Sequence, residues 1–177
     1  MILLIFLIFD NSFDRSVRDI FQRNRTPFLD KTFLVITESA DKDFFLLTHV
    51  LLSTLFSEHE RDDAKLSFIG VSSVSFFTLL IKYITRRERP SGGNGNPFNS
   101  SFPSGHASGS FAFSYILSKR HKNLTIPLFL WSSLVGVSRI YLDRHWATDV
   151  LAGSLLGISF GIIIMKYESN LLKFKIK

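Results

Sequence analysis

The chain has 177 residues, which is room for one domain and little more. Its hydrophobic content of 46%, its 19 phenylalanines and its mean hydropathy of +0.20 favour an integral membrane protein over a soluble globule. The net charge of +6 is typical of basic loops facing anionic lipid head groups, and no basic stripe interleaved with aromatics indicates nucleic acid. Cysteine is absent, which excludes disulfides and thiolate metal sites.

The first 42 residues divide into an apolar start and two amphipathic segments. Residues 1–9 are apolar but too short for a helix to cross a hydrocarbon core of ~30 Å, so we predict a partial or interfacial helix, or the remainder of a first span. Residues 12–42 place apolar side chains at helical spacing among charged ones, and Thr26-Pro27 divides them. We expect two helices lying on the membrane surface, with ordinary solvated helices as the alternative.

The rest of the chain alternates apolar segments with polar loops. The apolar segments are 44–56, 66–84, 107–117, 124–142 and 150–165. Residues 66–84 and 124–142 are long enough to span a membrane, and the shorter segments can span it if neighbouring helices cover their polar flanks. We therefore predict an all-α integral membrane bundle of about five to six helices. It forms one domain over residues 1–177, with the bundle over 43–168 and a basic tail over 169–177.

The last apolar segment carries glycines every four residues, at Gly153, Gly157 and Gly161. This spacing places them on one face of a helix. Small residues at such positions let helices approach closely in lipid, so we expect a tight helix contact here.

A first polar cluster follows residues 66–84. Lys82 and Arg89 are seven residues apart, about two turns on the same helix face. A lysine point charge and an arginine fork aimed at one spot can clamp a phosphate. The alternative is that Lys82 reaches the membrane interface and has no further role.

A second cluster, Phe102-Pro-Ser-Gly-His-Ala-Ser-Gly109, lies where a glycine-rich loop meets an apolar segment. It predicts a helix N-terminus, whose free N–H groups and dipole favour an anion. Ser104 adds a hydroxyl, Gly105 permits close approach, and His106 supplies an acid or base. A capped helix with an incidental histidine is the alternative.

A third cluster follows residues 124–142 and contains Arg139, His145 and Asp149. If a helix begins near Trp146, the Asp149 carboxylate can reach one imidazole nitrogen, fix the tautomer and leave the other nitrogen as a nucleophile. The alternative is a surface salt bridge between Asp149 and Arg144. Because the chain crosses twice between the second and third clusters, all three come to one membrane face and describe a site for a dianion.

These residues, Lys82-x6-Arg89-Pro90, Pro103-Ser-Gly-His106 and Ser138-Arg139-x5-His145-x3-Asp149, resemble the three motifs of the type 2 phosphatidic acid phosphatase family. That family also includes vanadium haloperoxidases and class A acid phosphatases. The resemblance implies a catalytic core like a four-helix bundle, with no metal or other cofactor. By resemblance, the phosphoryl oxygens bind to Lys82, Arg89, Ser104, Gly105 and Arg139. His145 is then the nucleophile, Asp149 its partner and His106 the general acid.

The predicted function is hydrolysis of a phosphate monoester or diphosphate on a membrane lipid, through a phosphohistidine. Phosphatidic acid, phosphatidylglycerol phosphate and polyprenyl diphosphate are candidate substrates. The alternatives are a vanadate-dependent haloperoxidase, a non-catalytic protein that binds anionic lipid, and a metallohydrolase with His106, His145 and Asp149 as ligands.

The distribution of basic residues between the two membrane faces predicts which face lies in the cytoplasm. Basic residues away from the predicted site are Arg61, Lys65, Lys119, Arg120, Lys122, Lys166, Lys173, Lys175 and Lys177. The positive-inside rule places that face in the cytoplasm. Opposing it are Arg15, Arg18, Arg23, Arg25, Lys31 and Lys42. Resemblance to bacterial lipid phosphatases favours a cytoplasmic-membrane protein with an outward-facing site, and we adopt that prediction.

Overall fold

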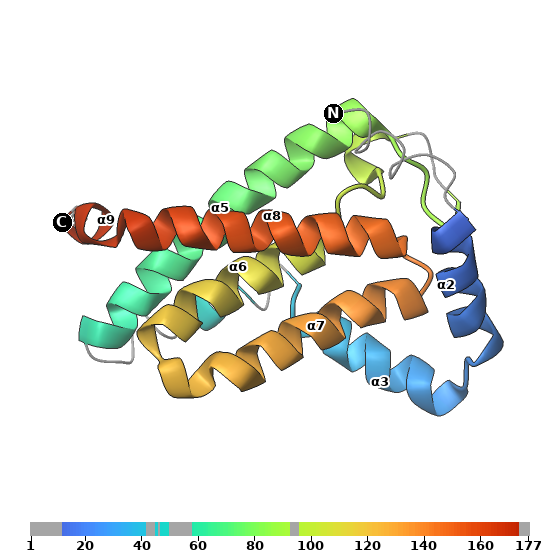
Figure 1. Cartoon of the computed structure of the whole chain (residues 1–177), viewed down its shortest axis with the longest axis horizontal. Coiled ribbons are helices and arrows are strands. Elements are labelled where there is room, and N and C mark those ends of the chain that lie inside the picture. Colours follow the sequence, from blue (N-terminus) through green and yellow to red (C-terminus); the bar gives the residue numbers. More distant parts are fainter. Residues whose placement is uncertain (1–11, 42–44, 46, 50–57, 93–95, 174–177) are drawn as a thin grey trace.

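The computed structural model describes residues 12–41, 45, 47–49, 58–92 and 96–173. These residues form helices and contain no strand, so the all-α prediction is confirmed (Figure 1). The α-helices are α2 (Ser12–Arg23), α3 (Pro27–Glu38), α5 (Glu58–Thr85), α6 (Gly105–Arg120), α7 (Thr125–Tyr141), α8 (Ala147–Lys166) and α9 (Glu168–Lys173). Two 3₁₀ turns are η1 (Pro97–Asn99) and η2 (Lys122–Leu124). The predicted partial helix over 1–9 and most of the predicted segment over 44–56 lie outside the described residues.

Three helical stretches in the described part are long and apolar enough to cross a membrane: Glu58–Thr85, Lys122–Tyr141 and Ala147–Lys166. They correspond to the three longest predicted apolar segments after residue 58, namely 66–84, 124–142 and 150–165. Their outer faces carry exposed side chains such as Phe76, Leu130 and Leu155. Exposed apolar faces of this kind suit contact with lipid, which agrees with an integral membrane protein.

Helix α6 lies at the centre of the bundle and packs against α5, α7 and α8 (Figure 1). Its buried positions hold small side chains, including Ala107, Ser108 and Ala112. Buried hydroxyls need partners, and Ser108 donates to the Gly105 carbonyl oxygen at 3.0 Å and meets Thr78 Oγ1 of α5 at 3.0 Å. A slender central helix therefore lets three others approach it.

The predicted glycine face of α8 makes the closest of these approaches. A methyl group at Gly153 would overlap the carbonyl oxygen of Ser104, and one at Gly157 would overlap that of Ser108. At Gly161 the obstacle is the side chain of Tyr115. The glycines thus allow α8 to lie directly on the backbone of α6, as the four-residue spacing predicted.

The amphipathic region divides where the sequence indicated. Thr26 caps α3, its hydroxyl accepting from the Leu29 amide at 3.2 Å, and Pro27 occupies the first turn. The helices pack on the bundle: α3 contacts α7, and α2 contacts α7 and α8. On α2, apolar Ile20 is 61% exposed, whereas Asp14 is only 1% exposed. Helix α2 therefore turns part of its charged face into the protein, which sequence periodicity did not predict.

The segment predicted as a basic tail over residues 169–177 begins within helix α9, which ends at Lys173. Helix α9 contacts α5. Leu171 and Leu172 pack against a buried cluster of Leu66, Ile116 and Ile164. Partial burial of these two leucines holds the segment against the bundle.

Candidate active site

The three predicted clusters meet at one end of the bundle, where α5 and α7 end and α6 and α8 begin (Figure 1). Arg89 Nη1 lies 3.3 Å from His145 Nε2. The Ser104 amide donates to the Asp149 carbonyl oxygen at 3.0 Å, and the His145 amide donates to the Arg139 carbonyl oxygen at 3.1 Å. Residues from four separate helix ends are thereby held in one place.

The second cluster forms the start of α6, as predicted. Ser104 is the N-cap residue, and its hydroxyl accepts from the Ala107 amide at 3.4 Å. Gly105 and His106 form the first turn, with His106 half-buried and Ser104 fully buried. The free N–H groups of this turn face the end of the bundle where the cations gather, which suits an anion.

Lys82 is buried, with 6% of its surface exposed, and does not reach outward to the interface. Its ammonium donates to the carbonyl oxygen of Ser100, in the loop that precedes α6. Burial of a lysine is unfavourable without a counter-group, so this position is costly unless the charge is used. The interfacial alternative for Lys82 is therefore wrong.

His145 is buried and has a defined tautomer. Its Nδ1 lies 2.7 Å from the carbonyl oxygen of Ser101, which can only accept, so Nδ1 carries the proton. Arg89 Nη1 can only donate, so Nε2 presents its lone pair. Burial, followed by the charges of Lys82, Arg139 and Arg89, lowers the pKa of His145 well below the usual value of 6.5. The imidazole is therefore neutral, with Nε2 directed toward the cations.

Asp149 lies close to His145 but does not fix its tautomer as the sequence suggested. The distance from Asp149 Oδ2 to His145 Nδ1 is 3.6 Å, too long for a hydrogen bond. Asp149 Oδ2 instead accepts from the Trp146 amide at 2.8 Å, and Oδ1 accepts from Arg87 Nη1 at 2.7 Å. Asp149 thus caps α8, and the Ser101 carbonyl orients the imidazole.

A buried ion-pair network behind Asp149 was missed in the sequence. Arg87 Nη2 pairs with Asp14 Oδ2 of α2 at 2.7 Å. Asp14 also accepts from the Thr148 amide at 2.9 Å and from the Thr148 hydroxyl at 2.5 Å. The only local signal was a pair of further arginines, Arg86 and Arg87, between Lys82 and Arg89. No spacing rule links it to an aspartate 73 residues away.

Arg139 and Arg89 complete the set of cations. Arg139 Nη1 donates to Thr37 Oγ1 of α3 at 2.7 Å, and its Nε is buried without a hydrogen-bond partner among the described residues. Arg89 donates through Nε to the Asn99 carbonyl oxygen at 3.0 Å. A buried, unpaired guanidinium nitrogen is a donor available to an anion.

A cavity of about 520 Å³ opens beside this cluster. Lys82, Gly105 and His106 line its polar end. Its remaining wall is largely apolar and includes Phe45 and Leu79. The cavity therefore combines a polar end, which includes the Lys82 ammonium, with a largely apolar wall.

The geometry does not support the metallohydrolase alternative. In the described part of the chain, one group of three possible ligands has its ligand atoms within 4.8 Å of one another, namely His59, Asp63 and His121. His106, His145 and Asp149 do not form such a group, and His145 Nδ1 is engaged by a carbonyl oxygen.

Fold and site together define a class: a membrane protein of packed helices with two histidines among cations at one end. The chain matches the PAP2 superfamily over residues 64–173, more than half of its length. It belongs to that superfamily. The matched region contains all three motifs that carried the resemblance in the sequence.

Two Bacillus subtilis (strain 168) relatives differ in how much of each protein aligns. Undecaprenyl-diphosphatase BcrC is 32% identical over 76 residues, which is 43% of this chain and 39% of that protein. Phosphatidylglycerophosphatase B is 26% identical over 166 residues, covering 86% of this chain and 82% of that protein. A third relative, lipid A 1-phosphatase of Porphyromonas gingivalis, is 38% identical over 84 residues, 45% of this chain and 18% of that protein. The chain thus spans less than half the length of BcrC and of the lipid A 1-phosphatase.

Two solved structures share the fold over nearly their whole length. Aquifex aeolicus LpxE has a TM-score of 0.77 at 24% identity, covering 89% of this chain and 98% of that chain. The transmembrane PAP2 type phosphatidylglycerolphosphate phosphatase of Bacillus subtilis has a TM-score of 0.78 at 23% identity, covering 98% and 96%. The fold is therefore that of a transmembrane PAP2 protein.

Proposed function

We propose that this protein hydrolyses a phosphate monoester or diphosphate on a membrane lipid through a phosphohistidine at His145. The observation that carries the proposal is the orientation of the His145 imidazole. Its Nδ1 is bonded to the Ser101 carbonyl oxygen, and its Nε2 lone pair points toward Arg89. A neutral, buried imidazole held in this way is a nucleophile positioned beside a binding site for an anion.

The phosphoryl oxygens bind to Lys82, Arg89, Arg139, the Ser104 hydroxyl and the Gly105 amide. Phosphoryl transfer depends mainly on positioning and charge stabilisation. Arg139 Nε, which has no hydrogen-bond partner among the described residues, and the first backbone amides of α6 are donors for these oxygens. Lys82 and Arg89 exchange backbone carbonyl partners for phosphoryl oxygens.

In the first step, Nε2 of His145 attacks phosphorus. The bond from phosphorus to the leaving oxygen breaks as the bond from phosphorus to nitrogen forms, and His106 gives its proton to the departing lipid alkoxide or phosphate. Asp149 stabilises the positive charge that develops on the imidazole through space, at 3.6 Å from Nδ1.

In the second step, neutral His106 takes a proton from water, and the resulting hydroxide attacks the phosphohistidine. The bond from phosphorus to nitrogen breaks, and inorganic phosphate leaves with His145 restored to its neutral form. The side-chain cations provide the charge neutralisation for both steps.

The substrate class follows from the cavity. Its polar end, with the Lys82 ammonium and His106, fits a phosphate head group, and its apolar wall at Phe45 and Leu79 fits the lipid chain next to it. A lipid phosphate can contact both the polar end and the apolar wall of the cavity, whereas a soluble phosphoester has no apolar chain to contact the wall. The names of the relatives support this class: they include an undecaprenyl-diphosphatase and a phosphatidylglycerophosphatase.

The decisive experiment measures inorganic phosphate released by the protein purified in detergent, without added metal. The substrates are phosphatidic acid, phosphatidylglycerol phosphate and undecaprenyl diphosphate. The His145→Gln protein, prepared in parallel, reports contaminating phosphatase. We expect release from at least one lipid by the native protein alone. Equal rates of phosphate release by the native and His145→Gln proteins on all three lipids would contradict the proposal.

We further propose that the site faces outward across a bacterial cytoplasmic membrane. Because the chain has no cysteine, single cysteines can report sidedness. Ser91→Cys lies in the exposed loop near the site, and Asn123→Cys lies on the exposed turn at the other end of the bundle. In intact cells an impermeant maleimide should label position 91 and label position 123 only after permeabilisation. The reverse pattern contradicts this orientation.

A further inference from the structure

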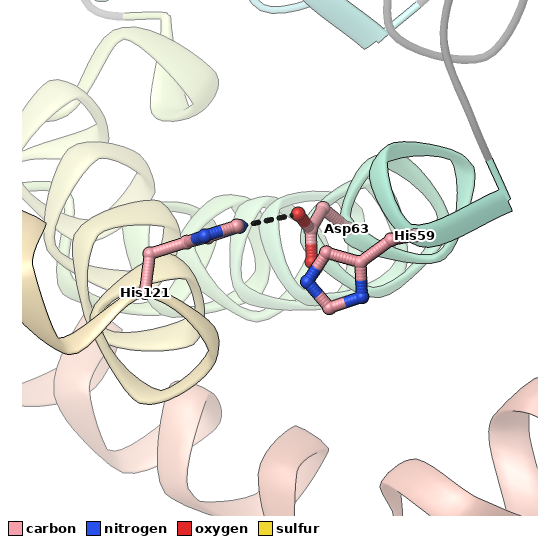
Figure 2. A group of neighbouring side chains, drawn as sticks. All are labelled: His59, Asp63 and His121. Carbon is pink, nitrogen blue, oxygen red and sulfur yellow. Dashed lines mark hydrogen bonds and ion pairs between the residues drawn. The ribbon is translucent and has the colours of Figure 1, made fainter.

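Three possible metal ligands converge at the end of the bundle opposite the candidate active site (Figure 2). His59 and Asp63 come from the start of α5, and His121 ends α6. One ligand atom from each lies within 4.8 Å of those of the other two. We propose that these side chains bind one divalent transition-metal ion of the zinc type. This inference is independent of the proposed phosphatase function.

The chain brings the ligands together in two steps. His59 and Asp63 are four residues apart in α5, which places them on one helix face. The antiparallel packing of α5 and α6 then brings His121 to that face, although it lies 58 residues from Asp63. The site is therefore a tertiary feature, shared by two central helices.

The atoms that face one another can act as metal ligands. His121 Nε2 lies 2.6 Å from Asp63 Oδ2, and Figure 2 shows this pair directed at each other beside the His59 ring. Arg120 Nη2 lies 3.1 Å from His59 Nδ1 and can only donate, so that nitrogen presents a lone pair. For a metal to bind, His121 Nε2 must give up the proton in its hydrogen bond with Asp63 and present a lone pair.

Arg120 lies beside the three candidate ligands and carries a positive charge. Its contacts orient the Asp63 carboxylate so that one oxygen faces the histidines. Its Nε pairs with Asp63 Oδ1 and its Nη1 with Glu168. Oδ1 is thus held from outside, as carboxylate ligands are held in metal sites, while Oδ2 faces the two histidines. The two carboxylates exceed the one guanidinium by one negative charge. A metal would replace the contact of Arg120 with His59 and the hydrogen bond between His121 and Asp63.

The donor set selects the kind of metal. Two imidazoles and one carboxylate suit zinc and its neighbours, whereas magnesium and calcium prefer all-oxygen sites. His59 is exposed, so an ion can enter from solvent, and water can take the fourth position. Bound there, the ion joins the start of α5 to the end of α6 and stabilises the bundle far from the reacting phosphate.

The test uses the full chain with a purification tag that contains no histidine, stripped with EDTA and kept in detergent. Zinc chloride is titrated by calorimetry, and bound zinc is counted by mass spectrometry after gel filtration. We expect one zinc per chain. We also expect the midpoint of thermal unfolding to rise by about 5 °C at roughly 100 times the dissociation constant.

Two variants and one control locate the ion. His59→Gln and His121→Gln should each weaken zinc binding by at least roughly tenfold and remove the thermal shift. Both residues are at least partly exposed, so the variants should fold. His106→Gln, at the other end, should bind zinc like the native protein. Absence of stoichiometric zinc in the native protein overturns the proposal, and so does loss of binding in His106→Gln with retention in His59→Gln.

Discussion

The two ends of this bundle both place histidines next to charged side chains, but the sign of the neighbouring charge differs. At the candidate active site, Lys82, Arg89 and Arg139 surround a buried histidine whose free nitrogen faces them. At the far end, two histidines flank the Asp63 carboxylate, and Arg120 is held between Asp63 and Glu168. The cations around His145 suit a phosphate, whereas the carboxylate of Asp63 between two histidines suits a metal ion.

The difference shows that the chemical role open to a histidine depends on the groups that its two ring nitrogens contact. His145 donates through Nδ1 to a backbone carbonyl and faces cations, which suits the nucleophilic role that we propose for it. His121 faces a carboxylate through Nε2. Each prediction below tests one element of this contrast.

The largest effect is expected for His145→Ala. Loss of the only proposed nucleophile should reduce turnover on every substrate by on the order of 10⁴-fold or more. Phosphate release and trapping of a ³²P-labelled phosphoenzyme measure this directly. A labelled phosphoenzyme in the variant would show that another residue carries the phosphoryl group.

His106→Ala should cost roughly 10²- to 10⁴-fold with a lipid leaving group, the usual contribution of general acid catalysis. With p-nitrophenyl phosphate, whose leaving group needs no proton, phosphoenzyme formation should be much less affected. The phosphohistidine should then accumulate, because the base that activates water is also missing. Equal losses with both leaving groups and no accumulation under rapid quench would show that the role of His106 is misassigned.

Arg87→Ala should destabilise the fold by about 3–5 kcal/mol, because it leaves Asp14 and Asp149 buried without their partner. Arg120→Ala is the matched variant at the far end, where Glu168 is 32% exposed and water can replace the guanidinium in part. Its cost should therefore be smaller. Thermal unfolding of both variants in one detergent compares them, and an equal loss would contradict the role of burial.

Asp149→Asn should have a smaller effect than His106→Ala, roughly tenfold on turnover. The sequence alone suggested a direct bond to His145, but the structure has the carboxylate 3.6 Å from Nδ1 and on the amide of Trp146. An asparagine oxygen can keep that amide bond while the charge is lost. A loss as large as that of His145→Ala would show that Asp149 bonds to the imidazole during turnover.

The smallest effect is expected in the pH dependence of kcat/KM, which reports the pKa of His145. Because burial and neighbouring cations lower the pKa of His145, its nucleophilic form persists below pH 6.5. The acid limb of kcat/KM attributable to this residue should therefore lie below that value. Stability should fall over the same range, since the unfolded chain binds this proton first. An acid limb at or above pH 6.5 would contradict a neutral, buried nucleophile.

The sequence predicted the helices well where the signal is local. Helix α5 contains the predicted segment 66–84 and extends two turns earlier to Glu58, because its first turns are polar and give no hydropathy signal. Thr26-Pro27 marked a cap, and the glycine repeat of α8 marked a close contact. Each of these signals acts within a few residues.

The residues of the candidate site were also predicted from sequence, but their connections were not. The three motifs placed histidines and cations at one end of the bundle. That the carbonyl of Ser101, rather than Asp149, orients His145 depends on how a loop folds over the imidazole. A backbone carbonyl leaves no mark in a sequence pattern.

The sequence by itself determined the class of protein, the helices and the residue types at the site, because hydropathy, caps and short motifs are properties of neighbouring residues. Only the tertiary structure decided that Asp14 of α2 is buried against Arg87, and that His59 and Asp63 meet His121. The physical reason is the same in both cases. The favourable energy of these polar groups comes from partners 58 or more residues away, and packing alone brings them within bonding distance.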